Sequence, residues 1–353
     1  MKKKIIGLIL LLIIMAAVGV IYLLKGNAPE TVTVNGYVGG EKIEFLEDPE
    51  VQAILQDRYS LKADYAKAGS LDMMTADPDG MDYLFPSSSI AEEYYEDLHG
   101  KPLQSEIILN TPIVLYTHKS VLEAFDSQGL ISENNGVYQI DMAGLVSLIQ
   151  NDTTWADIGL NELYGNISVD TTDPAKSNSG NMFAALLANV LNGGQTLTED
   201  NLRDILPELQ SIFGKLGYME TSSSDLFSQF LRMGVGAKPI IAGYESQLIE
   251  YAAIYPDEYK NIADDIVMLY PAPTVWSTHV LLALDENGQK FLDALLDEDL
   301  QSLAWTKHGF RTGNYSTAST GGSIAAKGVA PEITQVTQVP SYDVMKVIIE
   351  GLQ

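Results

Sequence analysis

Two long strand-like stretches, each interrupted by proline, constrain the fold of this 353-residue chain. The first is SEIILNTPIVLYTHK, residues 105–119, with Pro112 near its middle, and the second is IVMLYPAPTVWSTHVLLAL, residues 266–284. Proline cannot donate to a central ladder, so such a break suits a strand that leaves one sheet and enters another. The alternative for 105–119 is two short strands in one sheet. Two crossovers predict two lobes, which also fits a chain too long for one core of ~100 to 200 residues.

Strand patterns alternate with helical patterns before the first crossover. The segments in question are 31–40, 41–55, 61–70, 81–89 and 90–98. Alternation of this kind predicts parallel βαβ units, and ligands of open α/β sheets bind at the carboxyl ends of the strands. The predicted strands end in small and hydroxyl-bearing residues, namely Gly39, Gly40, Ser70, Ser87 and Ser88. We therefore expect these residues at one edge of the first sheet, with the serines also able to cap the helix that follows.

The segment between the crossovers contains a serine-rich loop before an apolar helix. NISVDTT, residues 166–172, reads as a strand, and NMFAALLANVL, residues 181–191, reads as a helix that is apolar on every side and therefore buried. Ser177, Asn178 and Ser179 lie at its start. One interpretation is that Ser177 or Ser179 caps the helix, which contributes ~1 kcal/mol. The other is that these side chains and the free backbone N–H groups of the helix start converge on a ligand oxygen.

Two further loops allow a similar pair of interpretations. TSSSD, residues 221–225, precedes a helical pattern, and Tyr244 and Glu245 follow a short apolar strand. Glu245 could accept a hydrogen bond from a cationic or hydroxylated ligand, or it could serve as a capping carboxylate for the next helix. Several helix starts that face one cleft are a typical construction for a small polar or anionic ligand.

The N-terminal segment predicts a membrane anchor. Residues 5–24 carry no charge, and ~20 such residues suffice to cross the hydrocarbon as a helix. Three lysines precede this span and only Lys25 follows it closely, which places the N-terminus in the cytoplasm and the rest of the chain outside. A cleaved secretory signal would have a shorter apolar core and a better cleavage site than GNA at 26–28.

Charge and composition exclude several classes of function. Without Lys2, Lys3, Lys4 and Lys25 the formal charge of −26 becomes about −30, and such a field repels nucleic acid and anionic membrane surfaces. The same field would favour a cation, whereas an anionic ligand would need local donors. Cysteine is absent, which excludes disulfides, thiolate metal sites and a lipid-modified cysteine.

Catalytic and metal-binding motifs are missing as well. The four histidines match neither HExxH nor any close ligand pair, and the chain has no G-x-S-x-G elbow and no GxxxxGK[ST] loop. GVGAKP, residues 234–239, departs from the dinucleotide-binding pattern at its third glycine. We therefore predict a protein that is not an enzyme, with no cofactor and no metal site.

With these features in place, residues 31–313 resemble the type II periplasmic or extracellular solute-binding proteins of ABC importers. The resemblance is carried by segments that include VNGYVGG, DYLFPSSS, TDPAKSNSGNMFAALL, GAKPIIAGYESQL and DALLDEDLQSLAWTKHGFRTG. It implies an α/β fold of two lobes, each a mostly parallel sheet flanked by helices, preceded here by one transmembrane helix. The implied division is 1–25 for the cytoplasmic N-terminus and anchor, 26–110 and 271–353 for lobe 1 with a C-terminal tail, and 111–270 for lobe 2.

The resemblance also implies a function and a site. In such proteins the ligand lies between the lobes, in contact with the early strand ends and a helix start of the second lobe. The matching positions are Gly39, Gly40, Ser70, Ser87, Ser88, Ser177, Asn178, Ser179, Tyr244 and Glu245. The expected activity is capture of a small polar or anionic solute or ion by lobe closure, with presentation to a membrane permease. An anchored sensor or accessory subunit that regulates another membrane protein, and an exported hydrolase, are the alternatives.

Overall fold

The computed structural model describes residues 15, 30–312 and 324–353. Apart from Met15, the predicted membrane span at 5–24 lies outside the described residues. Within the described part of the chain, no helix is long and apolar enough to cross a membrane.

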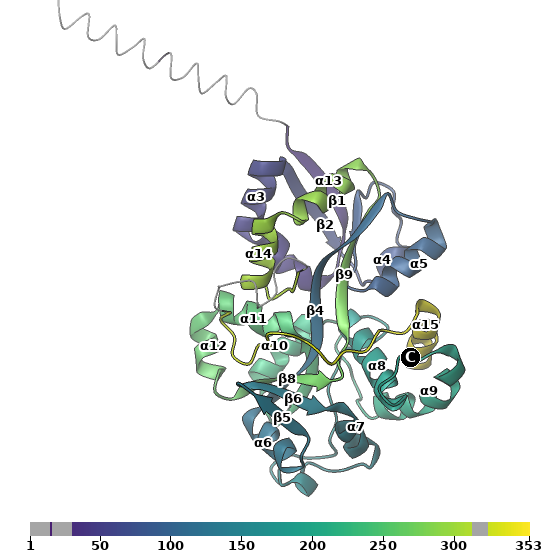
Figure 1. The fold of residues 1–353 in the computed structure, drawn as a ribbon, viewed down its shortest axis with the longest axis vertical. Coiled ribbons are helices and arrows are strands. Elements are labelled where there is room, and N and C mark those ends of the chain that lie inside the picture. The colour runs from purple at the N-terminus through teal and green to yellow at the C-terminus, as the bar shows by residue number, and fades with distance from the viewer. Residues whose placement is uncertain (1–14, 16–29, 313–323) are drawn as a thin grey trace, which may run out of the picture.

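The first lobe contains a sheet covered by helices on both faces (Figure 1). Strand β1 (Val32–Val38) pairs in parallel with β2 (Leu61–Lys67) and with β3 (Tyr83–Phe85), as the sequence predicted. One face packs against α2 (Ile43–Glu47), α3 (Pro49–Tyr59), α13 (Glu286–Leu295) and α14 (Glu298–Thr306), and η1 (Gly40–Lys42) precedes α2. The other face packs against α4 (Asp72–Thr75) and α5 (Ser89–His99).

The two crossovers are confirmed. Strand β4 (Gln104–His118) pairs with β9 (Trp276–Ala283) from Gln104 to Pro112, and from Ile113 onward it pairs with strands of the second sheet. Strand β8 (Ile266–Ala272) lies in the second sheet, and β9 returns to the first, where it also pairs with β3. The break at Pro112 therefore marks the place where one continuous strand changes sheets.

The second sheet corrects the prediction of a mostly parallel arrangement. Its strands β7 (Ile240–Tyr244) and β8 flank β4 in antiparallel fashion, because β4 enters from the other lobe and runs against both of them. Strands β5 (Ile131–Asn134) and β6 (Val137–Asp141) form an antiparallel hairpin, and among the described strands of this second sheet only β6 and β8 pair in parallel. Of the predicted strand at 166–172, only single bridges form among the described residues, at Asn166, Asp170 and Thr172. The architecture is thus a mixed α/β sheet.

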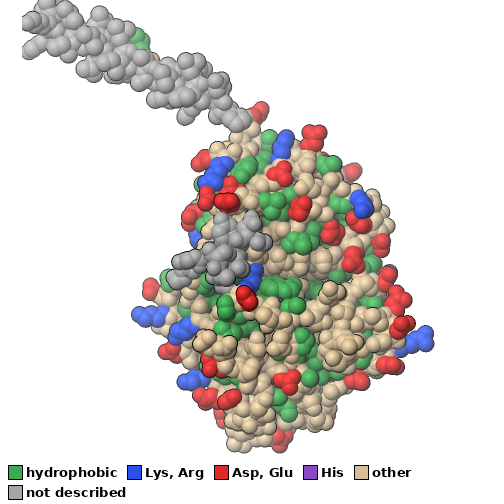
Figure 2. Space-filling model, in the orientation of Figure 1, with side chains coloured by type: hydrophobic (Ala, Val, Ile, Leu, Met, Phe, Trp, Pro, Cys, Tyr) green, Lys and Arg blue, Asp and Glu red, His purple; other side chains and the backbone are tan. Residues whose placement is uncertain are grey.

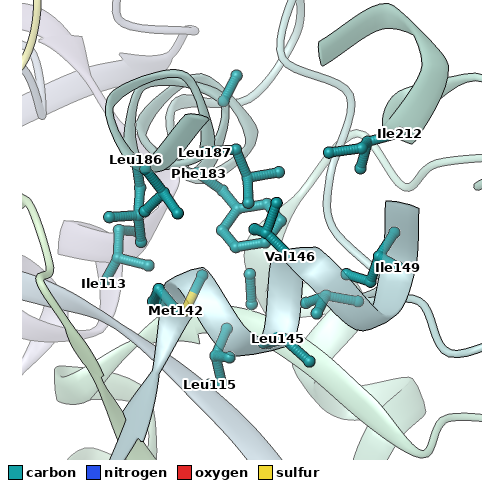
Figure 3. Close-up of a cluster of buried hydrophobic side chains, with 14 of the residues drawn as sticks. Ile113, Leu115, Met142, Leu145, Val146, Ile149, Phe183, Leu186, Leu187 and Ile212 are labelled. Carbon is teal, nitrogen blue, oxygen red and sulfur yellow. The ribbon is translucent and has the colours of Figure 1, made fainter. Parts of the chain in front are cut away.

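The second lobe has a core on each face of its sheet. One core joins α6 (Lys119–Ser127), α7 (Met142–Gln150), α8 (Asn178–Leu191) and α9 (Glu199–Phe213) to the sheet, and Figure 3 shows side chains of α7 directed toward those of α8. The other core joins α10 (Ser223–Met233), α11 (Glu245–Ile254) and α12 (Pro256–Ile262) to the opposite face. Helix α8 is buried from Ser179 to Val190, which confirms the prediction from its apolar sequence.

The C-terminal tail crosses the strands that connect the two lobes and ends beside the second lobe (Figure 1). Thr274 bridges Val336, and helix α15 (Tyr342–Gly351) packs against α8, α9 and α5. Its contact with α5 includes a stack of Tyr342 on Tyr94, with ring centroids 4.5 Å apart. The predicted lobe boundaries at residues 110 and 270 stay a prediction.

Candidate functional site

A cleft of about 510 Å³ lies between the strand ends of the first lobe and the helix starts of the second. We call it the interlobe cleft. Its first-lobe wall consists of the segments after β1 and β2, and its second-lobe wall consists of the starts of α8 and α10. The cleft brings together several residues that the sequence predicted for the site, namely Gly39, Gly40, Ser70, Ser177 and Asn178. It also contains the hydroxyl-rich loop 221–224. That these residues bind a ligand stays a prediction.

Asn178 connects the two lobes beside the cleft. Its Nδ2 lies 2.9 Å from the carbonyl oxygen of Ser87, which follows β3, and 3.1 Å from Oγ of Ser277 in β9. It also lies 3.0 Å from the Tyr244 hydroxyl at the end of β7. Tyr244 is 1 % exposed, and burial raises the pKa of its hydroxyl. Tyr244 therefore supports Asn178 from behind and does not line the cleft.

The serines at the start of α8 do not cap it through their side chains. Ser177 is the N-cap residue, as one interpretation expected, but its hydroxyl makes no capping hydrogen bond. Ser177 Oγ instead lies 3.1 Å from Ser179 Oγ, and buried Ser179 Oγ lies 2.7 Å from Thr172 Oγ1. Only Ser177 of this pair faces the cleft.

The serines of the first lobe have divided roles. Ser88 is a helix cap, since its Oγ accepts a hydrogen bond from the Ile90 N–H at 3.2 Å. Ser70 faces the cleft, and its Oγ accepts a hydrogen bond from the Ser87 N–H at 2.9 Å. Ser87 is fully buried behind the cleft wall.

A buried charged group, which sequence reasoning missed, stands behind Ser87. Lys42 is fully buried, and its Nζ lies 2.6 Å from Glu41 Oε1, 2.7 Å from Ser87 Oγ and 3.2 Å from His279 Nδ1. Ser87 Oγ in turn donates to Glu41 Oε1. We refer to Glu41, Lys42, Ser87 and His279 as the Lys42 cluster. The only signal in the sequence was a charged pair directly after Gly39 and Gly40 at a strand end.

Electrostatics keep the Lys42 cluster ionised at its centre. Burial alone would raise the pKa of Glu41, but the neighbouring Lys42 ammonium and the hydrogen bonds from Lys42 and Ser87 hold it at about 2. Burial and the Lys42 charge lower the pKa of His279 well below its usual range, so its imidazole is neutral. Burial also lowers the pKa of Lys42, and the Glu41 carboxylate opposes that effect. The cluster is therefore an ion pair with a neutral histidine as its third partner.

Glu245 lies away from the cleft. Its carboxylate is fully buried and accepts two hydrogen bonds from Arg311, at 2.6 Å to Nε and 2.7 Å to Nη2, and a further one from the Tyr270 hydroxyl. Because these partners hold its carboxylate, Glu245 neither caps α11 nor faces the cleft. Its sequence position after β7 was read correctly, but its side chain points to the return of the chain at Arg311.

Replacing Gly39 with alanine is expected to disturb the Lys42 cluster. A Cβ at this position would lie 2.7 Å from Ser87 Oγ and 2.9 Å from Lys42 Nζ, and both of those side chains are buried. The φ of −66° suits any residue, so the cost arises from crowding alone, about 1 to 3 kcal/mol. Urea denaturation measures it. Gly40→Ala is the matched control, because its Cβ would meet Lys67, whose exposed side chain can move; equal costs would contradict the crowding account.

No arrangement suited to a metal is found among the described residues, where no group of three or more His, Asp or Glu side chains could hold an ion. The ligating chemistry of the cleft consists of hydroxyls, amides, carboxylates and ammonium groups.

Comparison with known proteins gives the fold. No family model matches the sequence, and no curated protein matches it. Among solved structures, the substrate-binding protein of an ABC transporter from Agrobacterium tumefaciens is 14 % identical at a TM-score of 0.56, with 94 % of this chain and 96 % of that chain covered. The periplasmic binding protein AfuA from Actinobacillus pleuropneumoniae, with fructose-6-phosphate bound, is 14 % identical at a TM-score of 0.57, with 92 % and 97 % covered.

A third similar structure is the sulfate-binding protein SubI from Mycobacterium tuberculosis, 14 % identical at a TM-score of 0.54, with 81 % of this chain and 88 % of that chain covered. The fold is thus that of the periplasmic substrate-binding proteins. This agrees with the resemblance noted in the sequence, while the identities are too low to transfer a ligand.

Proposed function

We propose that this chain is an extracellular solute-binding protein that captures a small polar or anionic solute in the interlobe cleft. The observation that carries the proposal is the cleft itself, where the strand ends of one lobe face the serine-rich helix starts of the other. Similar structures with bound or named small ligands support it, since sulfate and fructose-6-phosphate are named for two of them.

Capture would proceed by closure of the lobes about β4 and the β8–β9 connection. These strands are shared by or pass between the two sheets, and closure by rotation about such connections is a common ligand response. Asn178 already links the lobes beside the cleft, so a ligand would add contacts between the two walls. The gain in the closed state shifts the population toward it.

The partner and the location belong to the same proposal. A membrane permease would bind the closed form. The apolar span at 5–24 would anchor the chain, with residues 26–353 outside the cell. Fractionation after a salt wash tests the anchor. Release of the full-length chain into the soluble fraction would contradict it.

A selective ligand is expected to stabilise the folded chain. A compound that binds only the folded state at 100 times its Kd adds about 2.7 kcal/mol to the free energy of unfolding. The measurement is a thermal-shift screen of the full-length chain with oxyanions, divalent metals, amino acids, sugars and nucleotides, joined to native mass spectrometry. No shift and no co-purified mass would contradict solute binding.

Ser177→Ala is expected to weaken that ligand with little loss of stability. Its hydroxyl faces the cleft and caps nothing, so we expect a severalfold rise in Kd while the free energy of unfolding without ligand is nearly unchanged. Ser341→Ala is the matched control, because Ser341 is also an N-cap residue without a capping hydrogen bond and lies outside the cleft. Equal ligand affinity in both variants would remove Ser177 from the site.

A further inference from the structure

The hydrogen bonds within the Lys42 cluster use the donors of its own members and leave one acceptor toward the cleft. A lysine ammonium has three protons. Those of Lys42 are directed to Glu41 Oε1, Ser87 Oγ and His279 Nδ1. The neutral His279 accepts at Nδ1, so its proton is on Nε2, which lies 3.4 Å from Ser277 Oγ. No proton of Lys42 or His279 remains for a ligand.

The serine donors near the cluster are also used internally. Ser87 Oγ donates to Glu41, the Ser87 N–H donates to Ser70, and Ser277 Oγ donates to the Ser87 carbonyl at 2.7 Å. Of these residues, Ser70 and Ser87 were predicted from the sequence as ligand-binding positions. The protons of Ser87 and Ser277 are thus directed to protein acceptors, so an oxyanion placed against the Lys42 cluster would meet the Glu41 carboxylate.

Glu41 is the member of the cluster that faces the cleft. Its side chain is 11 % exposed and lines the cavity, whereas those of Lys42 and His279 are fully buried. Every hydrogen bond of its carboxylate to other described residues falls on Oε1. Oε2 is therefore an acceptor without a partner among the described residues, on a mostly buried and ionised carboxylate in the wall of a ligand-sized cavity.

We propose that the solute carries a protonated amine, and that this amine donates to Glu41 Oε2. The inference rests on the proposed solute binding and narrows its ligand class. An ammonium group satisfies the vacant acceptor with a charge-assisted hydrogen bond. The overall charge acts in the same direction, since acidic side chains spread over the face in Figure 2 and the chain has 47 Asp and Glu against 21 Lys and Arg.

The rest of the cleft allows an anionic or polar group elsewhere on the same solute. Lys67 lines the cleft beside Gly40 and has no ion pair among the described residues, and the start of α10 contributes Ser222, Ser223 and Ser224. A solute with an amine at Glu41 and a polar or carboxylate group toward Lys67 would contact both the acidic and the basic side chain of the cleft wall.

The decisive experiment compares amines with their own acetylated forms. The full-length chain is titrated in a thermal-shift assay with amino acids and diamines, each beside its N-acetyl derivative, and with sulfate, phosphate and fructose-6-phosphate. We expect at least one free amine to stabilise the chain and its acetylated form to bind at least tenfold more weakly. Stabilisation by the anions alone would overturn the amine while upholding solute binding. No response to any probe would count against solute binding itself.

Variants at Glu41 test the contact with the stabilising amine from that assay. Glu41→Gln is expected to raise the Kd of that amine at least tenfold. Because this change leaves Lys42 without its anion, Glu41→Asp is the second variant, which keeps the charge and shortens the reach by one methylene, and it should also weaken binding. Glu44→Gln is the control, an exposed glutamate nearby that does not line the cleft. Unchanged affinity in a folded Glu41 variant would overturn the proposal.

Discussion

Replacing Arg311 with methionine should lower the free energy of unfolding by about 3 to 5 kcal/mol, the usual cost of removing one partner of a buried ion pair. The Arg311 side chain is 8 % exposed and that of Glu245 is fully buried. The guanidinium holds both oxygens of the carboxylate and also donates to the Ala330 carbonyl oxygen at 2.6 Å. The pair thus joins α11, the chain at 311 and the start of the tail. Methionine fills much of the space but leaves the carboxylate charged without a counterion.

Two further variants separate the charge effect from lost packing. In Arg311→Met combined with Glu245→Gln the buried charge is gone, so the double variant should be more stable than Arg311→Met alone. Arg58→Met is the matched control, since Arg58 also pairs with carboxylates, those of Asp297 and Asp299, but at the surface, and its loss should change stability far less. Urea denaturation at pH 7 measures all four proteins. A double variant as unstable as the single one would show that packing dominates.

The parts of the fold that local pattern determines were predictable from the sequence. Pro112 within a long apolar run indicated the strand that changes sheets, and the all-round apolar sequence of α8 indicated its burial. The direction of the strands in the second sheet was not predictable in this way. It follows from β4 entering that sheet from the other lobe, a non-local event that leaves no mark in the spacing of residues 240–272.

The candidate site was likewise predictable only in the features that local sequence determines. Strand ends and helix starts are local features, so Gly39, Ser70 and Ser177 fell on the cleft wall as expected. The partners of a charged side chain are set by tertiary contacts, so the sequence showed neither the ion pair of Glu245 nor the burial of Lys42. Glu245 pairs with Arg311, 66 positions away, and Lys42 contacts His279, 237 positions away. The residue types alone could not show that Ser87 would donate its hydroxyl proton to Glu41.

Replacing Lys42 with methionine should destabilise the chain by about 3 to 5 kcal/mol at pH 7, because the buried Glu41 carboxylate loses its ammonium partner. The pH dependence identifies the cause. In the unaltered chain the pKa of Glu41 is lowered from 4.5 to about 2, so its contribution is present above pH 4.5 and is lost as the pH falls toward 2. The shift corresponds to on the order of 3 kcal/mol.

In Lys42→Met the sign of this term reverses. Burial without a cation raises the pKa of a carboxyl group, so the destabilisation by Glu41 is present at neutral pH and is relieved as the group takes up a proton. The stability gap between the two proteins should therefore narrow from pH 7 to pH 4, as followed by urea denaturation at each pH. Lys42→Met combined with Glu41→Gln provides the control, since it lacks the titrating group and should show no reversed term. A gap that stays constant across this range would mean that the lysine acts through packing, and the ion-pair account of the Lys42 cluster, with the acceptor it presents to the cleft, would have to be abandoned.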